Sequence, residues 1–540
     1  MKKYQAKYLK SAVSFTFFFT IIMSLFVSCS KIDAPMTTAQ QNLRVNLRKE
    51  PVSLDPRKGN DMVASQLHFM LFEGLLKLKP DLTLSCAQAE SYTISEDGKT
   101  YTFHLRDSKW SDGTPVTAYD FEKSWKSLLD PMFPCPDAYL LYPVKNAQAA
   151  KKGQAPLYQV GIMSKNPKTL VVELESPTSH FLQVVASSVL LPINFQVEAK
   201  EPDWAESPTN FVSNGPFILK DWKLNREITL EKNPRYLNAS EVKLDQVTFE
   251  IIDNEASVLH LYFNGHFDLI GSPLSFVPEA ILHDQEKRKE LHYFPVASTK
   301  FLAFNTSKFP LNNRHLRQAL AHAIPRKEII EHITQLHQKE ALNILPSALM
   351  RKSTLDLIKD NDTATAKALL KKALSDLGIA PQDLSISLMY VSSGINQSIA
   401  LKLQDEWSKT LGIRVQLENV EFKQLHDRSK KSDFDIGVFA WLADYNDPMN
   451  ILERFQDKAS PRNYSKWTNE RYNHLLQLAK QSSSPQVYAQ MIQEAERFLI
   501  EEMPITGLYH DNYAFLINPR VKGFAISPLG HIYFESLWLD

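Results

Sequence analysis

The pattern of hydrophobic and polar positions in the last third of the chain predicts alternating helices and strands. Residues 364–378 place apolar side chains at helical spacing, and Gly378 marks the end of that helix. Further along, runs of branched and aromatic residues alternate with amphipathic segments. The pattern predicts strands over 384–391, 413–420 and 434–443, and helices over 395–411, 468–480 and 485–502. A β-α-β-β order of this kind is typical of an α/β lobe.

Shorter strands and tight turns dominate the first part of the chain. Residues 90–106 alternate apolar and polar side chains around an Asp97-Gly98 turn, which predicts a β-hairpin. Thr117 is placed to cap the start of a helix, with Asp120 three residues further on in a near capping box. The next apolar residues share one face of that helix: Phe121, Trp125 and Leu128.

The predicted strand over 434–443 ends in a carboxylate. Residues 436–443 are almost entirely apolar, which indicates a strand buried on both faces, and Asp444 follows directly, before a Tyr-Asn-Asp-Pro turn. An acid at the end of a buried strand is costly unless hydrogen-bond donors or a cation meet it. Two interpretations stand: Asp444 caps the turn or the next helix, or it receives the ammonium group of a ligand.

The amino terminus resembles the export signal of a bacterial lipoprotein. Lys2, Lys3, Lys7 and Lys10 precede an apolar stretch over 11–27, too short for an ordinary membrane span. Cys29 follows a small residue at the end of that stretch, as in a lipobox, although Phe26 stands where such motifs usually have Leu. We therefore expect a signal peptide over 1–28, lipidation of Cys29 and a tether over 29–41. An ordinary cleaved signal and an uncleaved anchor are the alternatives.

Composition and motifs exclude several classes of function. The chain has 540 residues, 44% of them hydrophobic, and 61 basic side chains balance 61 acidic ones, which gives no indication of nucleic-acid binding. It has no Gly-x-Ser-x-Gly elbow, no phosphate-binding glycine loop and no His-Glu-x-x-His motif. We predict no catalytic residue, no metal site and no cofactor. Cys86 and Cys135 form a disulfide or are both buried thiols; the sequence does not choose.

Motifs along nearly all of residues 42–540 resemble those of one family. The run from Trp110 to Trp125 closely resembles the signature of bacterial extracytoplasmic solute-binding protein family 5, the oligopeptide- and dipeptide-binding proteins of ABC importers. The Ala-Asp-Tyr-Asn-Asp-Pro stretch around Asp444 also resembles a motif of this family. Other matching stretches follow in family order: 54–56, 72–75, 103–106, 214–222, 244–249, 263–268 and 316–330.

The resemblance implies an α/β, two-lobed periplasmic-binding-protein fold of type II, with an extra inserted domain and hinge segments between the lobes. Lobe I is then expected over 42–62, 189–295 and 510–540. The inserted domain II is expected over 63–188, where the hairpin-rich pattern lies, and lobe III over 296–509. The hinges are expected where the chain crosses between lobes, near 190, 296–300 and 510.

The resemblance also implies how a ligand is held. In the peptide-binding branch an extended peptide lies between the lobes as an added strand, so that main-chain hydrogen bonds supply affinity and side chains occupy roomy pockets. Asp444 matches the acid that pairs with the α-ammonium group. Trp441 is expected to line a side-chain pocket, with core packing as its alternative, and Tyr139, or more weakly Tyr142, to add a wall from domain II. Main-chain contacts are expected from the strand and from the first loop: Phe439, Ala440, Leu442, Glu50 and Val52.

Two positions depart from the peptide-binding members that fix the ligand's carboxylate tightly. Val438 stands where some of them have Arg, and Asn396, still a candidate contact, stands where they have His. Pro51 also removes a backbone donor from the first loop. These departures favour longer, modified or differently anchored peptides, cell-wall-derived peptides among them.

Together these features predict a binding protein rather than an enzyme. We expect a monomer, exported and lipid-anchored to a membrane, facing the periplasm or the outside, that captures peptides for the permease and ATPase subunits of an ABC importer. A non-peptide ligand such as a metal chelate, haem or an opine-like compound is the first alternative. An exported hydrolase or a surface adhesin that has reused the fold is the second.

Overall fold

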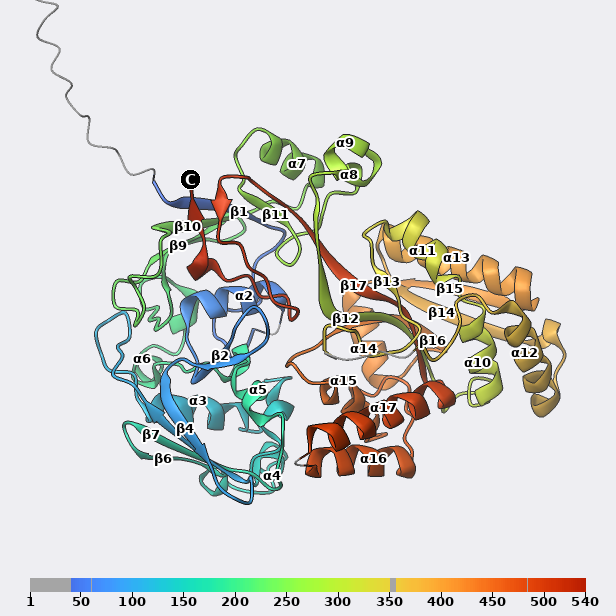
Figure 1. Ribbon diagram of the computed structural model, residues 1–540, viewed down its shortest axis with the longest axis horizontal. Coiled ribbons are helices and arrows are strands. Elements are labelled where there is room, and N and C mark those ends of the chain that lie inside the picture. The colour runs from blue at the N-terminus through green and yellow to red at the C-terminus, as the bar shows by residue number, and fades with distance from the viewer. Residues whose placement is uncertain (1–39, 60, 350–355, 483) are drawn as a thin grey trace, which may run out of the picture. The chain divides into compact units, whose positions relative to one another are not determined.

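A large mixed sheet runs through the computed structural model, which describes residues 40–59, 61–349, 356–482 and 484–540 (Figure 1). The strands follow the order β15-β14-β16-β12-β17-β11-β1-β10-β9-β8, and β13 also pairs with β17. The strand bounds are β1 Asn42–Leu47, β8 Phe217–Lys223, β9 Glu227–Lys232, β10 Gln246–Ile251, β11 Leu269–Gly271, β12 His292–Phe304, β13 Lys339–Glu340, β14 Ser385–Val391, β15 Arg414–Val420, β16 Ile436–Leu442 and β17 Ile505–Ile517.

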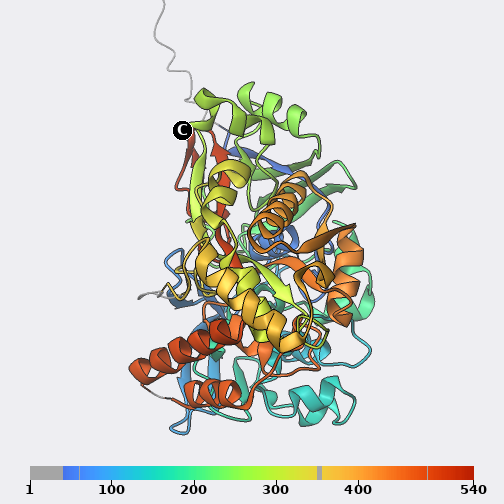
Figure 2. The same ribbon diagram turned by 90° about the vertical axis from the view of Figure 1, so that its right-hand side faces the viewer.

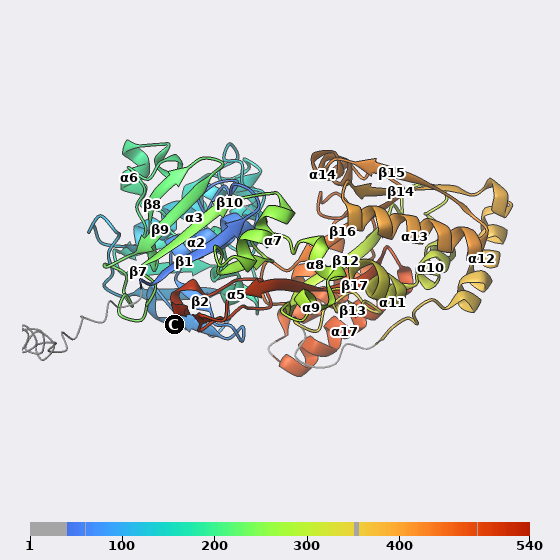
Figure 3. The same ribbon diagram turned by 90° about the horizontal axis from the view of Figure 1, so that it is seen from above.

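The two long strands β12 and β17 connect the two halves of this sheet. They are antiparallel neighbours, with β16, β14 and β15 beyond β12 and with β11, β1, β10, β9 and β8 beyond β17, an arrangement that Figure 3 shows from above. Their register shifts between Pro295 and Thr299, which breaks the regular ladder. The crossings expected near 296–300 and 510 therefore lie inside these strands.

The half of the sheet beyond β12 follows the predicted α/β pattern with one correction. β14, α13 (Gly394–Leu411), β15 and β16 lie where the sequence predicts them, but α14 (Phe422–Lys431) joins β15 to β16, where no helix is predicted. Figure 2 faces the helical side of this half. Its other helices are α10 Arg314–His322, α11 Arg326–Ile329, α12 Thr363–Leu377, α15 Met449–Leu452, α16 Glu470–Gln481 and α17 Pro485–Glu502.

A separate sheet in the order β4-β5-β7-β6 contains the predicted hairpin. Helix α3 (Ala118–Leu128) packs against β6 and β7, and Thr117 and Asp120 form the predicted capping box at its start. Phe121, Trp125 and Leu128 are fully buried on its inner face, which confirms the predicted core. The bounds of its strands are β4 Ala89–Ile94, β5 Thr100–Leu105, β6 Ile162–Asn166 and β7 Thr169–Glu173. Two small sheets complete the described strands: a hairpin of β2 Leu76–Leu78 with β3 Leu84–Cys86, and a C-terminal pair of β18 Val521–Lys522 with β19 Trp538–Leu539. The remaining helices are α2 Met62–Leu71, α4 Ala147–Lys151, α5 Phe181–Val185, α6 Phe195–Lys200, α7 Glu255–Phe263, α8 Glu279–His283 and α9 Gln285–Arg288.

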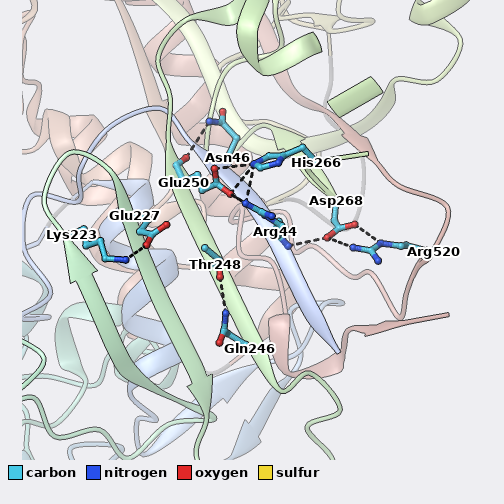
Figure 4. Close-up of polar contacts among 10 residues, drawn as sticks. All are labelled: Arg44, Asn46, Lys223, Glu227, Gln246, Thr248, Glu250, His266, Asp268 and Arg520. Carbon is cyan, nitrogen blue, oxygen red and sulfur yellow. Dashed lines mark hydrogen bonds and ion pairs between the residues drawn. The ribbon is translucent and has the colours of Figure 1, made fainter. Parts of the chain in front are cut away.

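A charged network holds β1, β10 and the C-terminal segment together (Figure 4). Arg44 donates from Nε to Glu250 Oε1 at 3.0 Å, and its backbone N–H donates to Asp268 Oδ2 at 2.9 Å. Asp268, whose side chain is 1% exposed, also receives Arg520 Nε at 2.6 Å and Nη2 at 2.9 Å. A buried carboxylate that accepts a two-pronged guanidinium contact is strongly held, since its neighbours replace the lost water.

Replacing Asp268 by asparagine is expected to lower the free energy of unfolding by about 2 kcal/mol, because the buried end of its contact with the half-exposed Arg520 loses its charge. Asp253→Asn is the matched control: Asp253 also pairs with an arginine, Arg48, at 2.6 Å, but its side chain is 71% exposed. That control should cost less than about 0.5 kcal/mol. Urea unfolding followed by circular dichroism measures both, and equal losses would contradict the assignment.

Candidate functional site

One edge of β16 is open along most of the strand. β12 pairs with β16 along its whole length, from Ser298 opposite Leu442 to Phe304 opposite Ile436. On the other side β14 pairs with β16 only at Ile436 and Gly437. No described strand covers the edge of residues 438–442, so their outward main-chain groups are available to an added extended chain.

β16 is buried from Ile436 to Phe439, and its side chains alternate between surface and core only over its last residues. Phe439 and Trp441 are buried, whereas Ala440 is exposed and Leu442 half-buried. The Trp441 ring lies 4.1 Å from the Phe301 ring, centroid to centroid, and Arg454 stacks on it at 4.8 Å. Trp441 therefore packs in the core, which was the alternative to its expected place on a pocket wall.

The main-chain groups of Phe439 and Trp441 face β12, because Ala443 N–H donates to the Ala297 carbonyl and Asp435 accepts from Asn305 N–H in the same regular ladder. The outward main-chain groups therefore belong to Val438, Ala440 and Leu442, and the expected ligand contact of Phe439 is wrong.

Asp444 stands at the end of this open edge with one carboxylate oxygen engaged. Oδ2 accepts a hydrogen bond from the Tyr139 hydroxyl and another from Asn450 Nδ2 at 3.1 Å, and Arg454 Nη2 lies 3.4 Å away. No described residue is hydrogen-bonded to Oδ1, and the side chain is 37% exposed. Asp444 thus combines the two interpretations of its sequence: it fixes the turn through Asn450 and keeps one oxygen open.

Tyr139 reaches Asp444 from the four-stranded-sheet part of the chain, as the sequence analysis expected of a wall residue. Burial, reinforced by the charge of Asp444, raises the pKa of Tyr139 well above its usual value, so the phenol is a neutral donor. The guanidinium of Arg462 lies 3.4 Å from the Tyr139 ring centroid. Tyr142, the weaker candidate, lines a cavity together with Tyr139. Among the described residues, Tyr139 hydrogen-bonds to Asp444 and Tyr142 does not.

Arginines on the far side of Asp444 were not foreseen. Arg454 and Arg462 lie 3.4 and 3.8 Å from Asp444 Oδ2, with side chains 9% and 23% exposed. Both follow Asp444 in the sequence, Arg454 within the second of two short helical segments after the turn and Arg462 beyond it, so no regular spacing indicates the contact. The negative charge of the Asp444 carboxylate is therefore partly balanced by these two arginines when no ligand is bound.

One cavity adjoins Asp444, and a second lies at the first loop. The first, the Asp444 cavity, has a volume of about 260 Å³ and is lined by Leu442, Ala443 and Asp444 together with Asp137 and Ser188. Burial and the nearby charge of Asp444 raise the pKa of Asp137 to about 6. The second, the Phe422 cavity, has a volume of about 630 Å³ and is lined by Lys49, Phe276, Phe422 and Tyr513 among others.

A lysine lies beside the open strand, where the sequence analysis found no cation. Lys300 is opposite Ala440 in the β12–β16 ladder, and its Nζ donates to Asn396 Oδ1 at 2.8 Å. Burial lowers the Lys300 pKa, and the charge of Asp511 opposes that shift. The hydrogen bond from Lys300 places Asn396 beside the open strand, although the two residues are 96 positions apart in the sequence. A single lysine within the apolar run of β12 was the available signal.

The first loop is expected to meet a ligand through its main chain; the Val52 N–H is engaged within the protein, whereas the Glu50 contacts involve its side chain and leave its main-chain role a prediction. The Glu50 side chain turns to β8, where Oε2 accepts from Trp222 Nε1 at 3.1 Å and Oε1 accepts from the Asn225 backbone. Val52 is 62% exposed, but its backbone N–H donates to Asp61 Oδ2 at 3.0 Å. The Glu50 carboxylate and the Val52 donor are therefore occupied, and Lys49 is the residue of this loop that lines the Phe422 cavity.

Both cysteines that the structure describes are free thiols, so the disulfide alternative is wrong; Cys135 is buried but Cys86 is half-buried, so the alternative of two buried thiols holds for Cys135 alone. Cys86 is fixed opposite Leu76 in the β2–β3 hairpin, and Cys135 is buried in the turn before residue 138, where burial raises its pKa to about 11. Cys29 and its expected lipidation lie outside the described residues. Within the described ranges no three histidine, cysteine or acidic side chains are grouped to hold a metal ion. The helices described there are all too short or too polar to cross a membrane.

Comparisons with known proteins agree on one family. The sequence model described as bacterial extracellular solute-binding proteins, family 5 Middle, matches residues 83–463. The oligopeptide-binding protein OppA of Bacillus subtilis is 36% identical over 92% of this chain and 92% of its own length. The murein tripeptide binding protein MppA of Escherichia coli superposes with a TM-score of 0.80 at 29% identity, covering 93% of this chain and 99% of its own. OppA of Haemophilus influenzae, in complex with the peptide RPPGFSPFR, has a TM-score of 0.78 at 27% identity, with 93% and 99% covered.

Proposed function

Because the chain belongs to family 5 of the bacterial extracellular solute-binding proteins, we propose that it is the substrate-binding component of a peptide ABC importer. The observation that carries this proposal is the open edge of residues 438–442, which ends in a carboxylate with one unengaged oxygen. An extended peptide adds to that edge through its main chain, and its ammonium group binds Asp444 Oδ1. The fold and the family support ligand capture rather than catalysis.

The ligand is held mainly by its backbone. Ala440 presents only a methyl group at the open edge, so it leaves room for different peptide side chains. Tyr139 closes the amino-terminal end. Lys300, opposite Ala440 in the ladder, supplies a cation for a peptide carboxylate in place of the anchors that Val438 and Asn396 do not supply. A charge-assisted contact from a buried lysine contributes roughly 1.5–3 kcal/mol.

The wider arrangement follows from the same family. The proposal places lobe I at 42–62, 189–295 and 510–540, domain II at 63–188 and lobe III at 296–509, with closure about β12 and β17. The register shift between Pro295 and Thr299 supports a hinge there, because an interrupted ladder bends more easily than a regular one. The mature monomer is attached to a membrane through Cys29 and passes its peptide to the permease and ATPase subunits.

Native mass spectrometry of the protein expressed without residues 1–29 and purified gently tests this function. We expect a series of adducts whose masses match peptides, and the range of masses gives the accepted lengths. A single non-peptide mass would contradict the proposal and favour a metal chelate, haem or an opine-like ligand. Bare protein that also fails to bind any member of a mixed peptide library would contradict it as well.

A cell-wall-derived peptide is the second candidate. The similarity to the murein tripeptide binding protein MppA of Escherichia coli supports it, as does the absence of a cation at Val438 in this chain. Calorimetric titration separates the two candidates: a purified murein tripeptide should bind at least about tenfold more tightly than an ordinary tripeptide of the same length if the cell-wall ligand is correct, and no more tightly if it is not.

A further inference from the structure

A third cavity lies behind Tyr139 and is strongly charged. It has a volume of about 610 Å³, and we call it the arginine cavity. Tyr139 and Tyr142 line it from one side, and residues 453–462 line it from the other. Its charged side chains are Lys152, Glu453, Arg454, Asp457, Arg462 and Lys480. Burial, assisted by Lys480, lowers the pKa of His180, which also lines the cavity, to about 4, so that imidazole is neutral near pH 7.

Two arginines of this cavity converge on one carboxylate oxygen. Arg454 Nη2 and Arg462 Nη2 approach the same oxygen, Asp444 Oδ2, at 3.4 and 3.8 Å. Arg462 Nη2 is buried and has no hydrogen-bond partner among the described residues. A buried guanidinium N–H without an acceptor is unfavourable until a ligand supplies one.

The acids of the cavity do not provide the missing partner. Glu453 pairs with Lys480 at 3.5 Å, and the Asp457 carboxylate accepts the backbone N–H of Ala459 at 2.8 Å. Neither carboxylate makes a described hydrogen bond to Arg462. The cavity therefore keeps an excess of positive charge close to Asp444.

We propose that the arginine cavity is a subsite for an anionic side chain, and that the protein prefers peptides whose first residue is Glu or Asp. This inference rests on the proposed function, since it assumes that the peptide's ammonium group binds Asp444. Asp444 lies where the ammonium group and the acidic side chain of such a residue would both bind: its Oδ1 is open to the ammonium group, while its Oδ2 faces the two arginines. Leu140 lines both the Asp444 cavity and the arginine cavity.

The chemistry of such a residue matches this division of charge. Its ammonium and its side-chain carboxylate are separated by only two or three carbon atoms, so one residue reaches both sides of Asp444. The ammonium side carries Asp137 and Asp444, which attract a cation. The other side carries Arg454 and Arg462, which attract a carboxylate through charge-assisted hydrogen bonds.

Calorimetric titration with two matched peptides, Glu-Ala-Ala-Ala and Gln-Ala-Ala-Ala, tests the preference. We expect the Glu peptide to bind the unaltered protein about fivefold to tenfold more tightly, since one charge-assisted contact replaces a neutral one. In Arg462→Gln the two affinities should differ by less than about twofold, and Arg462→Lys, which keeps the charge, should retain part of the preference. Arg471→Gln is the control, because Arg471 is 68% exposed and pairs with Glu494 away from the cavity; it should leave the ratio unchanged.

The outcomes separate the two proposals. Equal affinities for the two peptides in the unaltered protein would overturn the acidic preference and leave the peptide-binding function standing. A preference that survives in both Arg462→Gln and Arg454→Gln would also overturn the subsite. Failure of the unaltered protein to bind either peptide, or any member of a mixed peptide library, would overturn the function and this inference with it.

Discussion

Replacing Asp444 by asparagine is expected to weaken the binding of a peptide with a free amino terminus by about 10- to 100-fold. The ammonium group loses a charge-assisted contact in a partly buried site, and such contacts are worth roughly 1.5–3 kcal/mol. Asparagine keeps the size of the side chain and an oxygen for Tyr139. Arg454 and Arg462 lose their shared counter-charge, and their repulsion of the incoming ammonium adds to the loss.

An N-acetylated copy of the same peptide identifies the cause of that loss. It carries no ammonium, so its affinity should change by less than about threefold between the unaltered protein and Asp444→Asn. Asp405→Asn is the control variant, since Asp405 is 48% exposed and pairs with Lys409 on the surface of α13. Isothermal titration calorimetry measures every affinity. If the free and the acetylated peptides lose equally, Asp444 shapes the site without binding the amine.

Patterns within one element were predictable from the sequence, and the end of the chain illustrates why. A buried apolar stripe is present on each of the helices α12, α13, α16 and α17, and β16 is a nearly continuous apolar run. The order of residues within each element is therefore enough to predict which of its positions are buried. α14 was missed because Leu425 and Ser429 are the residues it buries, and Phe422 at its start is 73% exposed. The polar and apolar residues of α14 are segregated, but with Phe422 and Leu425 as its large apolar residues the segment has too little apolar content to be recognised as a core helix.

The strand and the acid of the site were predictable, but the partners of that acid were not. Arg454 and Arg462 reach Asp444 only because a turn and short helices fold the chain back after it. Lys300 comes from β12 and meets Asn396 through pairing of distant strands. The direction of the Glu50 side chain depends on Trp222, far along the chain. Contacts of this kind are set by tertiary packing and leave no local pattern.

Replacing Trp125 by alanine is expected to lower the free energy of unfolding by about 4 kcal/mol, since large buried aromatic side chains typically contribute 3–5 kcal/mol. Trp125 is fully buried on α3, and its Nε1 donates to the carbonyl of Leu190 at 2.7 Å. Alanine leaves both a cavity and an unpaired buried carbonyl. Ser187, Ser188 and Val189, just before that carbonyl, line the Asp444 cavity, so Trp125 also fixes one wall of the site.

Trp125→Phe separates packing from hydrogen bonding. Phenylalanine keeps most of the buried ring and removes the N–H, so its expected loss is about 1–2 kcal/mol. Tyr158→Ala is the control for removing an aromatic side chain, because Tyr158 is 78% exposed and should contribute less than about 0.5 kcal/mol. Urea unfolding followed by far-UV circular dichroism compares the three variants. A loss below about 1 kcal/mol in Trp125→Ala would show that this helix face is not what holds residues 187–190 against the site.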